Sequence, residues 1–495
     1  MARSRPPRCT HDDEILFLAC SVAAALLGTA PVRAENLIEV YLDAVRSDPL
    51  VREAEARRSA ALEVKPQARA LLLPQVNLGG QVYTANSDGE STFPQVNQTT
   101  GNIVTVGNKS STDVSQYWDY SAELTHTVFR WDQWQELKRA DSQVAVAEAT
   151  YRAAQQDLLV RVAQAYFDVL AAEDTLGAAQ ATLEAFSRQL EQAEKRFEVG
   201  LIAVTDVQES RAAHDSATAS VIAAKRTLAT SQEVLRELTD KDYQALVKPA
   251  EQMPLNKPDP EDEQAWVDLA LADNLNVIAA RLNSEVASAN AKIAQAGHMP
   301  TVDLFAQYNE SNRDATQTNQ SFDPSGGLGA GDRVGGSADS NVTSDVIGLR
   351  VNIPIFSGGG TQSRVREQVH LHRAAREKLE GTMRSAERET RDAYLGVIAE
   401  KARVQALSQA VKSSQTALEA TEAGFEVGTR TTVDVLDARR RLFEAQRDYA
   451  RSRYDYLINI VRLESATGGL KQDDLDAING FLTQPTALPV VRPKS

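Results

Sequence analysis

The stretch RFEVGLIAVTDVQESR at residues 196–211 returns as GFEVGTRTTVDVLDAR at residues 424–439. The two copies lie 228 residues apart, and the same offset pairs Gly200 with Gly428. In each copy the glycine stands between two long helical patterns, where a helix can end and the chain can reverse. A Thr or Asp follows soon after, at a position that can cap the next helix. The sequence therefore predicts two helix–turn–helix tips in a chain built from two internal repeats.

Apolar residues recur at every seventh position in the helical pattern before each glycine. They are Leu176, Leu183, Leu190 and Phe197 in the first copy, and Val404, Val411, Leu418 and Phe425 in the second. Sustained heptads indicate packed, supercoiled helices, and an unbroken helix from Trp131 to Glu198 would be roughly 100 Å long. A coiled-coil rod would show the same heptads, but the strand patterns between the helices argue against a rod alone.

Four segments with period two lie between the helical patterns. They begin near Val76, Trp118, Val302 and Ile347, and each has one apolar and one polar face. Such strands could belong to a soluble sandwich. However, their apparent length of about ten to twelve residues suits a tilted membrane strand, and aromatic residues gather at both ends of the second strand. The polar tracts Thr84–Gln116 and Asn309–Ser344 are predicted to be long exposed loops.

The chain divides at changes in composition. Residues 1–34 resemble a secretion signal, with a basic start, an apolar run and a small-residue cleavage site at Val32-Arg33-Ala34. Residues 35–240 form the predicted first repeat and residues 263–467 the second. Each is expected to contain a helix, a strand, a loop, a strand and long helices; the first of these helices are expected at 35–72 and 263–297. Residues 241–262, with four prolines, are predicted as a linker, and residues 468–495 as an irregular tail.

Composition and motifs exclude several functions. Both cysteines, Cys9 and Cys20, lie in the signal, so we expect no disulfide, no thiol chemistry and no cysteine metal site in the remaining chain. The net charge of −15 disfavours nucleic-acid binding, which depends on neutralising phosphates. His370 and His372 are two apart on a helix and face different sides. The run 358–360 is glycine-rich but lacks the Lys and Ser/Thr of a phosphate loop. We therefore expect no enzyme, no metal and no cofactor.

The strands set a requirement on assembly. After the signal no apolar run of 18 residues occurs, so any crossing of a membrane would have to use β-strands. Four strands cannot close a barrel, and open edges in lipid leave unpaired backbone groups that cost several kcal/mol each. Several chains would therefore have to share one barrel.

Four stretches, in order along the chain, resemble the TolC-type outer membrane efflux proteins, the outer membrane factor family: Glu35–Leu37, Ala296–Leu304, Ile353–Gly359 and Val427–Ala438. The resemblance covers essentially the whole chain after the signal. It implies an α+β membrane protein that forms a homotrimer. Three chains would give a 12-stranded β-barrel in the outer membrane lipid, with four strands per chain, continued by a long periplasmic α-helical barrel.

The same resemblance implies a function. The protein would be the exit duct of tripartite efflux and type I secretion systems, working with a periplasmic adaptor (membrane fusion) protein and an inner-membrane pump. The turn residues Val199, Gly200, Val427 and Gly428 would be where the adaptor docks. The alternative is a periplasmic coiled-coil adaptor or a surface adhesin. An adaptor is expected to have one long hairpin and a lipoyl-like domain, rather than duplicated hairpins with amphipathic strands.

By position in the family motif, Asp434 and Asp437 are the expected gate of the periplasmic aperture. They lie three residues apart on one helix face, and rings of carboxylates attract cations. Within such a ring each charge should raise the pKa of the others. The other interpretation is that an Asp at a helix start is a cap. The resemblance also implies a latch that ties the hairpin to its neighbours, formed by Arg430, Thr205, Asp206 and Phe425, in which an Arg–carboxylate link gives specificity.

Overall fold

The computed structural model describes residues 34–96, 100–250, 253–322 and 333–487, so nearly all of the predicted signal lies outside the described residues. Within them the chain forms two compact units. One contains residues up to 58, 146–281 and from 378 onward, and the other contains residues 59–145 and 282–377. Each unit takes segments from both halves of the chain, so the units do not coincide with the predicted repeats. The repeat boundaries stay a prediction.

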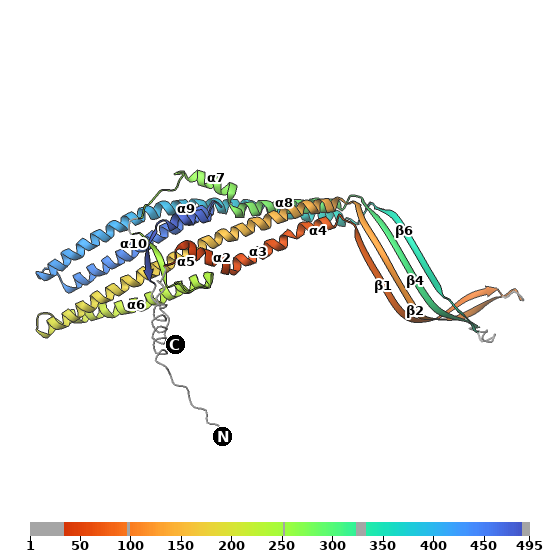
Figure 1. Ribbon diagram of the computed structural model, residues 1–495, viewed down its shortest axis with the longest axis horizontal. Helices are drawn as coiled ribbons and strands as arrows, with labels where there is room; N and C mark the ends of the chain where they lie inside the picture. The colour runs from red at the N-terminus through yellow and green to blue at the C-terminus, as the bar shows by residue number, and fades with distance from the viewer. Residues whose placement is uncertain (1–33, 97–99, 251–252, 323–332, 488–495) are drawn as a thin grey trace, which may run out of the picture. The chain divides into compact units, whose positions relative to one another are not determined.

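The unit of residues 59–145 and 282–377 contains one antiparallel sheet (Figure 1). Its strands are β1 (Gln75–Val96), β2 (Ile103–Phe129), β4 (Thr301–Phe322), β5 (Arg333–Ser337) and β6 (Ser340–Asn352). β2 lies between β1 and β4, and β4 pairs with β6 along Thr301–Arg313 and with β5 along Thr316–Gln320. In the described residues β1 pairs only with β2, and β5 and β6 pair only with β4, so β1 forms one edge of the sheet and β5 with β6 forms the other.

The prediction of two long loops is largely wrong. Thr84–Gln116 and Asn309–Ser344 are mostly strand, because β1, β2 and β4 continue well past the amphipathic segments. Polar side chains on both faces give no period-two signal, whereas the backbone ladder pairs regardless of side chain. Register shifts between Tyr83 and Ala85 and between Val114 and Gln116 mark where the alternating pattern stops.

Four long helices form two hairpins in agreement with the predicted turns (Figure 1). They are α5 (Trp131–Glu198), α6 (Val204–Thr239), α9 (Gly360–Glu426) and α10 (Thr432–Ala466). The core of the helical unit consists mainly of residues from these helices, and Phe167 belongs to it. The Phe167 ring lies edge-on to Tyr166 at 5.5 Å and stacks on Tyr454 at 6.0 Å, between ring centroids.

Each shorter helical stretch is broken, contrary to the prediction. Residues 35–72 form α2 (Leu37–Ser47), α3 (Pro49–Leu62) and α4 (Val64–Ala70). The first break occurs because a residue before proline avoids helical geometry and Asp48 precedes Pro49. Residues 263–297 form α7 (Glu263–Asp273) and α8 (Leu275–Ala296). Asn274 separates them, and its Oδ1 accepts hydrogen bonds from the backbone N–H groups of Asn276 and Val277.

The predicted linker and the predicted irregular tail are both partly regular. β3 (Ala245–Pro249) pairs antiparallel with β7 (Leu482–Ala487), and α11 (Gln472–Asn479) precedes β7. Lys248 in β3 lies 2.6 Å from a carboxylate oxygen of Asp174 in α5, and the Tyr454 hydroxyl donates to the other oxygen at 2.7 Å. These contacts join the segment between the repeats to two long helices.

Within the residues that the structure describes, none of the helices combines the length and the apolarity needed to cross a bilayer.

Candidate gate at the helical tips

The turn of each hairpin is set by its glycine. Gly200 has φ +76° and Gly428 has φ +78°, in the left-handed region that other residues enter at a cost. The Gly200 N–H donates to the Phe197 carbonyl at 2.9 Å, and the Gly428 N–H donates to the Phe425 carbonyl at 3.1 Å. These bonds satisfy carbonyls at the helix ends. The flanking valines of both turns, Val199 and Val427, are exposed, so each tip presents an apolar side chain to solvent.

The carboxylates after each turn cap the returning helix. Asp434 accepts hydrogen bonds from the Thr431 backbone N–H at 2.8 Å and from the Thr431 hydroxyl at 2.9 Å. Asp206 accepts from the backbone N–H of Ala203 at 3.3 Å. The hydrogen bonds from Thr431 lower the pKa of the Asp434 carboxyl, and nearby Arg430 lowers it further. Within one chain Asp434 and Asp206 therefore both act as helix caps. That the gate carboxylates raise the pKa of one another stays a prediction, because it requires several chains.

Asp437, the second expected gate residue, lies one turn further along α10. It is partly exposed, and its carboxylate is 3.4 Å from the guanidinium of Arg440 on the same helix. An ion pair of this kind contributes little and leaves the carboxylate open to solvent and ions. Asp434 and Asp437 therefore lie together at the start of α10.

The expected latch residues do not meet within one chain. The side chain of Arg430 is exposed and makes no hydrogen bond or ion pair in the described part of the chain, whereas its backbone N–H donates to the Gly424 carbonyl at 3.2 Å. Thr205 is exposed as well, and Asp206 is occupied by its cap. Phe425 lies under the guanidinium of Arg196 from the other hairpin, 5.1 Å from its ring centroid. The free cation of Arg430 is thus available to a neighbouring chain.

An ion pair that was not predicted from the sequence closes each hairpin, at equivalent positions in the two copies. Arg211 donates to Glu194 at 2.8 Å, and Arg439 donates to Glu422 at 2.7 Å. Both pairs obey the 228-residue offset, so the signal is present in the sequence. Arg439 also donates to the Ala185 carbonyl of α5 at 3.4 Å, and therefore links the second hairpin to the first.

Apolar side chains join the two hairpins at the same level. Leu436 of α10 packs in one cluster with Phe186 of α5 and with Ala213 and Ala217 of α6. The gate residues therefore lie on a helix whose opposite side is buried against the other hairpin. Their positions depend on how the two hairpins pack.

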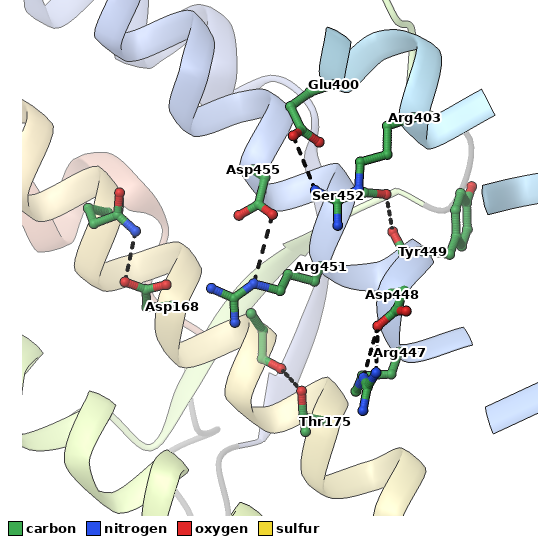
Figure 2. Close-up of polar contacts among 12 residues, drawn as sticks. Asp168, Thr175, Glu400, Arg403, Arg447, Asp448, Tyr449, Arg451, Ser452 and Asp455 are labelled. Carbon is green, nitrogen blue, oxygen red and sulfur yellow. Dashed lines mark hydrogen bonds and ion pairs between the residues drawn. The ribbon is translucent and has the colours of Figure 1, made fainter. Parts of the chain in front are cut away.

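A further group of charged side chains lies on α5, α9 and α10 away from the turns (Figure 2). Its contacts are mostly within single helices, such as the pair between Arg451 and Asp455 and the hydrogen bond from Arg403 to Glu400 at 3.2 Å. Burial raises the pKa of the Asp455 carboxyl, and the Arg451 charge opposes this. No predicted gate residue belongs to this group.

The fold of this chain is similar to that of a solved outer membrane protein. VceC from Vibrio cholerae matches with a TM-score of 0.64 and 22% identity, over 88% of this chain and 96% of that chain.

Sequence comparison identifies the family. Residues 40–240 and 266–469 match the outer membrane efflux protein family, and the chain belongs to it. The outer membrane protein TolC of Vibrio cholerae is 34% identical over 469 residues, covering 95% of this chain and 98% of TolC. The alkaline protease secretion protein AprF of Pseudomonas aeruginosa is 26% identical over 447 residues, covering 90% of this chain and 86% of AprF.

These matches confirm the predicted family, location and channel function. The protein is an outer membrane exit duct for efflux and type I secretion, with a periplasmic extension, and its family and relatives are channel proteins rather than enzymes. The alternative of an adaptor or adhesin is set aside.

Proposed function

We propose that three copies of the chain pool β1, β2, β4 and β6 into one 12-stranded barrel, continued by a periplasmic barrel of the long helices. One observation carries this proposal. The sheet has two open edges and an apolar face that is bare in one chain, with Leu78 81% exposed and Ile347 77% exposed. In lipid such a face is favourable but open edges are not, and closure with further copies removes the edges.

We propose that the tips gate this duct. In a trimer Asp434 and Asp437 of three chains would surround one axis and form two carboxylate rings that attract cations. The unpaired guanidinium of Arg430 supports the proposed latch, because it leaves a cation available for Thr205 or Asp206 of a neighbouring hairpin. Phe425 would belong to the same latch through its contact with Arg196. The closed state would be held by a few such links.

The tips also suit the proposed partners. Val199 and Val427 are exposed beside Gly200 and Gly428, and an exposed apolar residue at a turn can enter a pocket of another protein. We propose that a periplasmic adaptor, together with an inner-membrane pump, binds there and selects the open state. The two repeat-equivalent ion pairs and turns support the proposal that the hairpins are duplicated units.

Conductance in planar bilayers tests the gate. Asp434→Ala with Asp437→Ala should enlarge conductance and weaken divalent block on the order of tenfold, equivalent to about 1.4 kcal/mol of cation binding. Asp434 also caps α10, so the matched control is Thr431→Ala, which removes a cap hydroxyl and keeps both carboxylates. Unchanged block in the double variant, or equal loss in the control, would remove the two aspartates from the gate.

A further inference from the structure

The helices that leave the sheet have two distinguishable sides. A cavity of about 640 Å³ is lined by one side of α5, α8 and α9, with Asp132, Asn290 and Arg364 among its residues. Thr301 and Asn352 also line it. These two pair across β4 and β6 and share a face with Asp303 and Arg350, the polar face of the sheet. The cavity side of the helices therefore continues the polar face.

The opposite side of these helices carries cations and an aromatic residue. At about 100° per residue, Trp134 lies opposite Asp132, Lys292 lies opposite Asn290, and Arg366 lies opposite Arg364. Lys138 lies at the edge of the same side. This side therefore continues the apolar face of the sheet, which the proposed function places against lipid.

These cations are unpaired and close to the strands. The side chains of Lys138, Lys292 and Arg366 are exposed and make no hydrogen bond or ion pair within the described ranges, whereas Lys65 is paired with Asp141 and Arg130 with Asp303. At 1.5 Å per residue Arg366 is about 9 Å from the start of α9, and Lys292 about 6 Å from the end of α8. Both distances fall within about one Debye length of a membrane surface at physiological salt.

On α8 and α9 the carboxylates of this side lie further from the strands, and on α5 Asp141 lies on this side but is paired with Lys65. Glu285 is seven residues further from the sheet than Lys292, and Glu377 is eleven residues further than Arg366. Glu367 lies between the two sides of α9. The chain as a whole has a net charge of −15, so a local excess of unpaired cations is not a consequence of general composition.

We propose that Lys138, Lys292 and Arg366, with Trp134, bind the phosphate groups of anionic phospholipids in the leaflet that the helices leave. The proposal rests on the proposed function, because it requires the apolar face of the sheet to meet lipid. Basic side chains beside a membrane attract anionic headgroups, and an indole prefers the headgroup level. The cations would hold the barrel at a fixed depth and retain anionic lipid around it.

The test uses the full-length protein, purified in detergent and stripped of lipid. Retention of added phosphatidylglycerol and phosphatidylcholine is then measured by native mass spectrometry at two salt concentrations. The wild type should retain phosphatidylglycerol more strongly, and high salt should weaken this retention. Arg366→Gln should lose about fivefold in phosphatidylglycerol affinity, and the combined Lys138→Gln, Lys292→Gln and Arg366→Gln variant at least about tenfold.

Arg373→Gln is the matched control. Arg373 lies seven residues after Arg366, so it has the same charge on the same side of α9, but it is about 10 Å further from the strands. The affinity of Arg373→Gln for phosphatidylglycerol should stay within about twofold of that of the wild type. Equal retention of both lipids, an unaffected triple variant, or equal loss in Arg373→Gln would overturn the proposal and would indicate that a neighbouring chain or another protein covers this side. The same spectra give the mass of the assembly, so a failure of trimer formation is distinguished from a failure of lipid binding.

Discussion

The glycines at the tips are required by backbone geometry rather than by lack of space. A Cβ built on Gly428 meets no atom within 4 Å, yet its φ is +78°. Gly381, inside α9, also has open space around a built Cβ, but its backbone is helical. The same substitution at these two positions should therefore have opposite effects.

Gly428→Ala should destabilise the second tip by about 1–2 kcal/mol, because alanine must adopt a left-handed conformation. Gly381→Ala should stabilise α9 by about 0.5–1 kcal/mol, because the glycine loses more conformational freedom on folding. Hydrogen exchange of the amides near each position measures both effects. Slower exchange at the tip in Gly428→Ala would contradict the account of the turn.

The Asp434 cap should make the start of α10 sensitive to acid. Its pKa is lowered from the ordinary value of 3.8 by the hydrogen bonds from Thr431, so the folded state favours the carboxylate. The stabilisation is present above 3.8 and is lost as the pH falls through the lowered value. Amide protection in the first turn of α10 should fall in that range in the wild type. Asp434→Asn, which cannot titrate, should show no such step; an identical step in both proteins would rule out this cap as its origin.

At the scale of single residues, prediction from the sequence succeeded where the local backbone geometry determines which residue is needed. The glycines and capping aspartates follow from chain reversal alone. The pair of Arg439 with Glu422 was detectable from the offset, because Arg211 and Glu194 repeat it. The contact of Arg196 with Phe425 was not, because it joins non-equivalent positions on different hairpins.

At the scale of elements, each hairpin has an ion pair at the equivalent position, but the two pairs differ in their exposure to solvent. Arg439 and Glu422 have side chains 23% and 38% exposed, whereas Arg211 and Glu194 are 52% and 44% exposed. Less solvent screens the former pair, and two nitrogens of Arg439 share one oxygen of Glu422. The second hairpin should therefore depend more strongly on its ion pair than the first.

Double-mutant cycles to alanine should measure a coupling energy of about 1 kcal/mol or more for Arg439 with Glu422, and about 0.2–0.5 kcal/mol for Arg211 with Glu194. The cycle for Arg211 with Glu194 is the control, because these two residues stand at the equivalent positions of the other hairpin. Chemical denaturation of the detergent-solubilised protein gives the free energies. A larger coupling energy for Arg211 with Glu194 than for Arg439 with Glu422 would contradict this ranking.

The strands that were not predicted from the sequence lack a local signal in their residues. Beyond Tyr83 the strands have polar side chains on both faces, so periodicity disappears while backbone pairing continues to Val96. β3 was missed because prolines surround it and its partner β7 is more than 230 residues away. The long helices were predicted well, since heptads and terminal glycines are local signals.

At the scale of the whole molecule, one chain cannot satisfy its own sheet. β1 and β6 present unpaired edges in the described residues, and one face of the same sheet exposes Val76, Leu78 and Leu349. Water would favour covering that face, and lipid would favour covering the edges. A closed ring of identical chains in a membrane satisfies both requirements. The proposed gate follows from the same ring, because only several copies bring Asp434 residues together.

The most direct test is the number of chains in the detergent-extracted protein, measured by light scattering corrected for bound detergent or by native mass spectrometry. We expect the protein to require detergent for extraction and to contain three chains, which dissociate only on heating. A folded monomer that stays soluble in plain buffer would contradict the account, because its strand edges and its apolar face would then need no partner.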